Sequence, residues 1–88
     1  MEKKIEIMIR EAGVAEVKEC MRGGVVKFAF RKKDGSVRVA LGTLQRERFS
    51  YVPEGPARVH EGLTTYFDME RGSFRSFLDA NLVGIVQD

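Results

Sequence analysis

The hydrophobic pattern of the chain changes at Gly23-Gly24. Before these glycines, apolar residues recur at helical spacing, and after them apolar and polar residues alternate as in a β-strand. We predict a helix over residues 14–22 that ends at the glycines, because glycine weakens a helix interior and suits a helix end. Its apolar side consists of Val14, Val17, Cys20 and Met21. Cys20 is therefore expected to be a small buried side chain.

Residues 3–12 fit two patterns. One is the stripe of an amphipathic helix, whose members are Ile5, Met8, Ile9 and Ala12. The other is a strand, because isoleucines alternate from Ile5 to Ile9 and isoleucine favours strands. Gly13, followed by an apolar residue, fits a helical C-terminal cap. We therefore predict a helix over 3–12, and with it a helical N-terminal segment over 1–22.

Residues 25–41 predict a β-hairpin. In the first half, apolar residues alternate from Val26 to Phe30 and give one aromatic face. Asp34-Gly35 is typical of a tight hairpin turn, because this pair readily adopts positive φ angles. After the return strand, Gly42 is expected to relieve crowding as a bulge or a sharp bend.

The second half of the chain predicts three more strands. Residues 45–62 contain both prolines and predict a long exposed loop, with room for a short strand over 49–52. A strand over 64–70 follows, and strands over 74–77 and 82–86 are separated by one helical turn. Five short strands in this order describe a small, strongly bent antiparallel barrel, because closing the sheet removes edges that a short chain cannot cover.

We expect one domain over residues 1–88, with the barrel over 23–88. The strand over 64–70 is expected to turn Phe67 and Met69 inward. The expected core is Ile5, Ile9, Val17, Met21, Val26, Phe28, Phe30, Val39, Leu41, Leu44, Phe67, Met69, Phe77, Leu82 and Ile85.

Two blocks of residues carry a family resemblance. The first is Val25-Val26-Lys27-Phe28-Ala29-Phe30-Arg31-Lys32-Lys33-Asp34-Gly35-Ser36-Val37-Arg38 with Gly42-Thr43-Leu44, and the second is Thr65-Tyr66-Phe67-Asp68, Gly72, Phe74-Arg75-Ser76-Phe77 and Asn81-Leu82. Over roughly residues 23–86, the chain resembles short bacterial SH3 β-barrel fold-containing proteins of unknown function. The resemblance implies a mainly β (α+β) fold, a five-stranded SH3-like small barrel preceded by a short helical segment. It implies no functional residues.

Composition excludes several classes of protein. The chain has 88 residues, of which 43% are hydrophobic and 32% charged, and this is typical of a globular domain rather than a disordered chain. A lone cysteine excludes an internal disulfide, and with a single histidine it leads us to expect no metal and no cofactor. No apolar run reaches the roughly 20 residues of a membrane helix, and no signal-like segment is evident. We expect a cytoplasmic protein, and no small-molecule substrate is indicated.

Catalytic residues are not indicated, so we do not expect an enzyme. A nucleophile needs a neighbouring base, and the single histidine, His60, lies in the proline-containing loop. Asp68 and Glu70 have the spacing of paired carboxylates on one strand face. Surface acidic residues near a turn are the commoner arrangement.

Positive charge is concentrated in residues 21–50, which carry eight cationic and two acidic side chains in a protein of net charge +2. Alternation is expected to place the hairpin cations on the face opposite the phenylalanines. Such a face either keeps the strands soluble or binds phosphates. The candidate nucleic-acid-binding residues are Lys27, Arg31, Lys32, Lys33 and Arg38, with Tyr66 or Tyr51 for base stacking.

Two functional hypotheses follow. The first is a non-catalytic accessory or regulatory module whose partner is a protein, or a second copy of the chain, bound through the apolar N-terminal helices. The alternative is a nucleic-acid-binding small barrel that uses the basic hairpin over 25–41.

Overall fold

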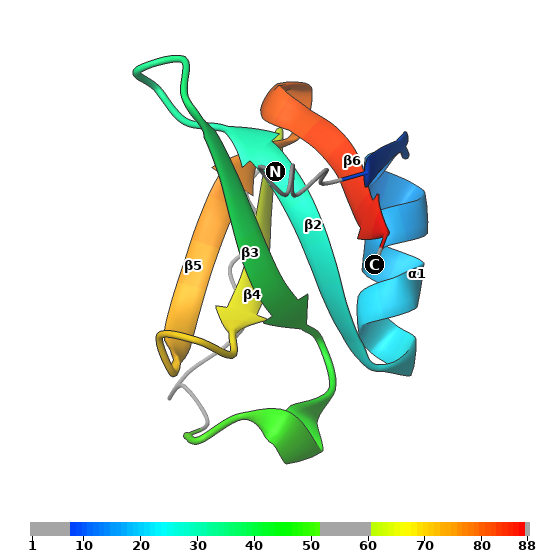
Figure 1. Ribbon diagram of the computed structural model, residues 1–88. Helices are drawn as coiled ribbons and strands as arrows, with labels where there is room; N and C mark the ends of the chain where they lie inside the picture. Colours follow the sequence, from blue (N-terminus) through cyan, green and yellow to red (C-terminus); the bar gives the residue numbers. More distant parts are fainter. Residues whose placement is uncertain (1–7, 52–60, 88) are drawn as a thin grey trace, which may run out of the picture.

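Six antiparallel strands in one bent sheet, with one α-helix packed against it, make up residues 8–51 and 61–87, the part of the chain that this computed structural model describes (Figure 1). The elements are β1 (Met8–Glu11), α1 (Val14–Gly23), β2 (Val25–Arg31), β3 (Val37–Thr43), the 3-10 turn η1 (Arg46–Arg48), β4 (Leu63–Asp68), β5 (Ser73–Leu78), the 3-10 turn η2 (Asp79–Asn81) and β6 (Leu82–Gln87). The strand order is β1-β6-β2-β3-β4-β5. The predicted mainly β fold is confirmed, and β2 to β6 are its five expected strands.

The β2–β3 hairpin is the longest paired element, and it joins Val25 with Thr43 at one end and Arg31 with Val37 at the other. Its turn is stabilised by Asp34, whose carboxylate accepts hydrogen bonds from the Ser36 hydroxyl (2.6 Å) and the Ser36 backbone N–H (2.9 Å). These bonds lower the pKa of Asp34. Gly35 adopts φ +89°, as expected of an Asp-Gly turn.

The predicted helix over 3–12 is wrong for the residues that the structure describes, because β1 pairs antiparallel with β6 instead. Residues 3–7 lie outside the described part. The edge of β6 supplies hydrogen-bond partners for residues 8–11. The alternating isoleucines are compatible with a helix or a strand, and this pairing with β6 selects the strand. Gly84 admits the pairing, since a Cβ at this position would lie 2.2 Å from the Arg10 carbonyl oxygen. The helix predicted over 14–22 is confirmed as α1.

The core lies between α1 and the concave face of the sheet. Val17 and Met21 of α1 are fully buried against an aromatic group that we call the inner cluster: Phe28, Phe30, Tyr66 and Phe77. Its ring centroids are 5.0 to 6.0 Å apart. Gly42 pairs regularly with Val26, so it does not form the expected bulge or sharp bend. It does relieve crowding, since a Cβ at this position would lie 2.6 Å from the Tyr66 ring.

Several predicted core positions differ in the structure. Ile9 and Met69 are exposed, and Ile5 lies outside the described residues. Cys20, expected to be buried, is exposed, because the sheet leaves that side of α1 uncovered. The core also includes the small residues Ala29 and Ala40, which the apolar pattern had not singled out.

The loop after β3 is described as far as residue 51, and residues 49–51 do not form the short strand that was expected there. None of the helices in the described ranges has the length and apolar character that a membrane crossing requires.

Candidate nucleic-acid interface

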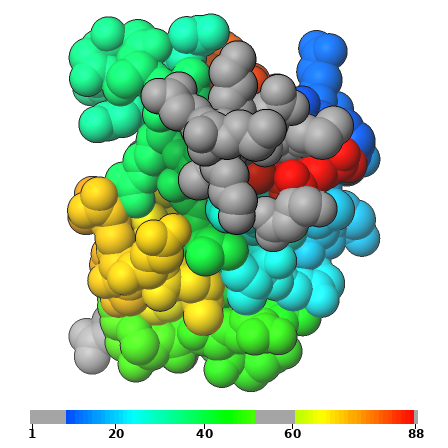
Figure 2. Space-filling model, in the orientation of Figure 1, coloured from blue at the N-terminus to red at the C-terminus, as the bar shows by residue number. Residues whose placement is uncertain are grey.

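The predicted nucleic-acid-binding residues do not form one surface, and three of them share the hairpin tip. Arg31, Lys32 and Lys33 are consecutive and exposed where β2 enters the turn. The Arg31 guanidinium donates a hydrogen bond to the Gly35 carbonyl at 3.2 Å, which keeps its charge at the tip. Figure 2 shows the tip, coloured teal to green, projecting at the upper left of the molecule.

Lys27 lies away from the tip. It is four residues from Arg31 on the same strand, about 13 Å at about 3.3 Å per residue, and its side chain is partly buried. Lys27 is therefore too far from Arg31 to belong to the same basic surface at the hairpin tip.

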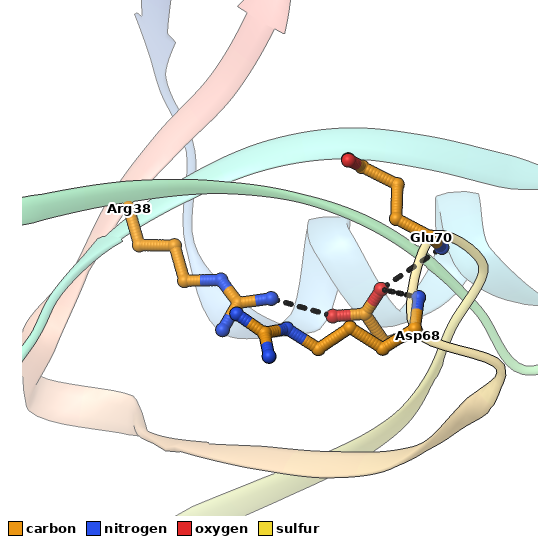
Figure 3. Close-up of polar contacts among 4 residues, drawn as sticks. Arg38, Asp68 and Glu70 are labelled. Carbon is orange, nitrogen blue, oxygen red and sulfur yellow. Dashed lines mark hydrogen bonds and ion pairs between the residues drawn. The ribbon is translucent and has the colours of Figure 1, made fainter.

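Arg38 was expected to face outward, and this is wrong. It pairs directly with Phe30 in the β2–β3 register, and opposite residues of an antiparallel pair share a face. Arg38 therefore lies on the concave side, where its guanidinium donates to the Asp68 carboxylate at 2.8 Å (Figure 3). With its side chain 22% exposed and bound to Asp68, Arg38 is a poor phosphate contact.

Asp68 is completely buried, which corrects the expectation of a surface acidic residue. Its second oxygen accepts the backbone N–H groups of Glu70 (3.0 Å) and Arg71 (3.1 Å). Figure 3 shows the Glu70 carboxylate pointing away from Asp68, so the two do not form a catalytic pair. Asp68 instead stabilises the β4–β5 turn and neutralises Arg38.

Tyr66, one of the two stacking candidates, is 1% exposed and lies in the core, so its ring is not available to stack on bases. The side chains of Thr64, Tyr66 and Asp68 face the core, and Phe67 takes the opposite face. The Tyr66 hydroxyl is buried and has no hydrogen-bond partner among the described residues. Burial, followed by the nearby Asp68 charge, raises the pKa of Tyr66.

Tyr51 is the tyrosine that solvent reaches, with 48% of its surface exposed. It belongs to a second aromatic group on the convex side of β4 and β5, the outer cluster: Phe49, Tyr51, Phe67 and Phe74. Its ring packs edge-to-face on Phe74 at 5.4 Å, and its hydroxyl accepts the Phe74 N–H at 3.4 Å. The sequence marked Tyr51 as a stacking candidate but gave no sign of this support.

The buried side chains of Thr43 and Thr64 stabilise the fold. Thr43 donates to the Gly24 carbonyl at 2.8 Å and ties the end of α1 to β3, and Thr64 bonds the Asp79 carboxylate. Among residues 8–51 and 61–87, no three His, Cys, Asp or Glu side chains form a group that could hold a metal ion. His60 lies outside these ranges.

Comparison with known families agrees with this architecture. A family model described as WYL_2, Sm-like SH3 beta-barrel fold, matches residues 14–83, from the first residue of α1 into β6. β1 and Gly84 lie outside the matched stretch. No curated protein and no solved structure matches the chain. The family match confirms the resemblance to SH3 β-barrel proteins that the residue blocks carry.

Proposed function

The chain belongs to the WYL_2 family of Sm-like SH3 β-barrel folds, and from this premise we propose that it is a non-catalytic module that binds the phosphate backbone of a nucleic acid through the tip of the β2–β3 hairpin. One observation carries the proposal: three consecutive cations, Arg31, Lys32 and Lys33, are exposed on a projecting turn. Each phosphate that such a cation neutralises releases counterions, which favours binding.

The ionised Asp34 carboxylate of the turn offsets part of this charge, since it interacts with Lys32, but the tip carries three cations against this one acidic residue. The Asp34 carboxylate is bound by the Ser36 backbone and hydroxyl, which orients it into the turn. The tip therefore keeps an excess of positive charge toward a ligand.

A binding role is favoured over catalysis because the buried side chains of Asp68, Thr43 and Thr64 already have structural partners. Asp68 holds Arg38 and two backbone N–H groups, and Thr43 joins α1 to β3. Such groups are not available to activate a substrate without loss of the fold.

Tyr51 extends the proposal toward single strands, because exposed aromatic rings stack on unpaired bases. The tip and Tyr51 lie toward opposite ends of β3, which spans about 20 Å over seven residues. An oligonucleotide that follows β3 would contact both.

Binding of mixed-sequence single-stranded and duplex oligonucleotides, titrated with salt, tests the proposal. We expect log K to fall linearly with log salt, and Lys32→Gln and Lys33→Gln each to reduce the slope by about 0.7–0.9. Lys18→Gln on α1 removes the same charge elsewhere and should leave the slope unchanged. Tyr51→Ala should weaken single-strand binding by about 1–3 kcal/mol, whereas Tyr51→Phe should not. Absent or salt-independent binding would end the proposal.

A protein partner bound through the N-terminal helices has less support. Val17 and Met21 are fully buried in the core, and Val14 packs against it. The apolar side of α1 is therefore mostly covered by the sheet and leaves little apolar surface for a partner. Sedimentation of the full chain at micromolar concentration should show a monomer, and self-association would favour this alternative.

A further inference from the structure

A group of arginines lies on the concave side of the sheet, around the end of β4. Arg75 of β5 pairs directly with Tyr66, so the two side chains share the concave face. Arg38 of β3 lies on the same face and donates to the Asp68 carboxylate. Arg71 belongs to the turn between β4 and β5, where its backbone N–H donates to the same carboxylate at 3.1 Å. Two strands and one turn therefore bring three arginines to this end of the concave face.

The charges of these arginines all act on the hydroxyl of Tyr66. Burial, followed by the Asp68 charge, raises the pKa of Tyr66, and three positive charges act against this rise: Arg38, Arg75 and Arg71. Exposed charges are largely screened from their surroundings beyond about 10 Å at 0.1 M salt. The three guanidiniums therefore lie close to the Tyr66 hydroxyl.

Among the described residues, one carboxylate acts on this group, and it is already occupied. Asp68 is bound by Arg38 at 2.8 Å and by two backbone N–H groups. The Glu70 carboxylate points away from Asp68 (Figure 3). Arg71 and Arg75 are exposed, and within residues 8–51 and 61–87 neither side chain has an ion pair. Their two guanidiniums are therefore available to an anion.

The Tyr66 hydroxyl adds a hydrogen-bond donor to these charges. It is buried and has no partner among the described residues. Such a group is uncommon in a folded protein, because a buried donor without an acceptor costs free energy. Arg71 and Arg75 are exposed side chains that can turn to admit an anion, whose oxygen would accept the hydroxyl proton in a hydrogen bond.

We propose that Arg71, Arg75 and the Tyr66 hydroxyl bind a phosphate group on the concave face of the sheet. A guanidinium is planar and can donate two parallel hydrogen bonds to phosphate oxygens, which favours this ligand over a halide. The site is separate from the hairpin tip, and it would stand if the tip bound no nucleic acid. A free phosphate and a nucleic-acid phosphate share this chemistry, and competition between them identifies the source.

Titration with inorganic phosphate at constant ionic strength, followed by NMR of the backbone amides, tests the site. Saturable shifts are expected at Arg71, Gly72 and Arg75, and sodium chloride should not produce them. Arg71→Gln and Arg75→Gln should each weaken binding about tenfold or more, because hydrogen bonds to charged groups are the stronger ones. Tyr66→Phe should weaken binding severalfold while the protein stays folded.

Arg46→Gln is the matched control, since Arg46 of η1 is also exposed and has no ion pair within the described ranges. It should leave the phosphate affinity unchanged, and so should Lys32→Gln at the hairpin tip. Equal losses in the control and in the two site variants would overturn the proposal, because they would indicate attraction by total charge. Shifts that do not saturate would overturn it as well.

An oligonucleotide without terminal phosphates distinguishes the two sources. Displacement of inorganic phosphate from the Arg71 and Arg75 amides would support the site and assign it to a nucleic-acid backbone. Phosphate binding that the oligonucleotide leaves intact would support it as a site for free phosphate.

Discussion

The inner and outer aromatic clusters lie on opposite faces of β4, and successive residues of that strand supply one ring to each. Tyr66 packs into the inner cluster under Val17 and Met21 of α1. Phe67 packs into the outer cluster against Phe49 and Tyr51. Tyr51 remains about half exposed in this cluster. The same kind of side chain is therefore buried where α1 covers the face, and it is reached by solvent at Tyr51, where none of the described helices covers the face.

The largest difference should appear when one ring is removed from each cluster. Phe28 is fully buried and touches three other rings, so Phe28→Ala should cost about 3–5 kcal/mol of unfolding free energy. Phe74 is only partly buried, and Phe74→Ala should cost less than half as much. Urea unfolding of both variants measures the difference. Equal losses would show that the outer cluster is as much a core as the inner one.

A smaller effect is expected from added volume at the inner cluster. Gly42→Ala would place its Cβ 2.6 Å from Tyr66 and 2.8 Å from Phe28, so it should destabilise the protein by about 1–3 kcal/mol. Gly13→Ala is the matched control, since nothing lies within 4 Å of its Cβ position. Thermal unfolding of the two variants compares them, and a Gly42→Ala protein as stable as the control would mean that the inner rings can move aside.

The smallest effect on stability is expected from removal of the buried Tyr66 hydroxyl. Tyr66→Phe removes a buried hydroxyl that has no partner among the described residues, so it should leave stability unchanged or raise it by up to about 1 kcal/mol. A marked loss of stability would indicate that the hydroxyl has a partner in solution.

The same variant tests the pH dependence. The pKa of Tyr66 is raised above its ordinary 10.0 in the folded protein, so above this pH the unfolded chain loses its proton first and binds fewer protons. Stability should therefore fall as pH rises from about 10 toward the folded pKa. Unfolding followed against pH should show less of this fall in Tyr66→Phe, and an identical fall in both proteins would contradict the assignment.

Local patterns determined the elements whose signals lie within a few neighbouring residues. The apolar spacing before Gly23 is sufficient for α1, and Asp34-Gly35 is sufficient for the hairpin turn, because helix ends and tight turns depend on the conformations of adjacent residues. The exposed cations at the tip follow from the same turn. This part of the candidate site was accessible from the sequence.

Tertiary structure decided which face of each strand is closed and which strand edges are paired. Alternation around Tyr66 and Phe67 offers an aromatic ring to both faces of β4, and only the approach of α1 selects Tyr66 for the core. Residues 8–11 become a strand because β6, at the far end of the chain, presents an edge to them. Arg38 turns away from solvent because Asp68, thirty residues later, is buried beside it. These outcomes depend on contacts between segments that are distant in sequence. The spacing of hydrophobic residues within one segment therefore cannot predict them.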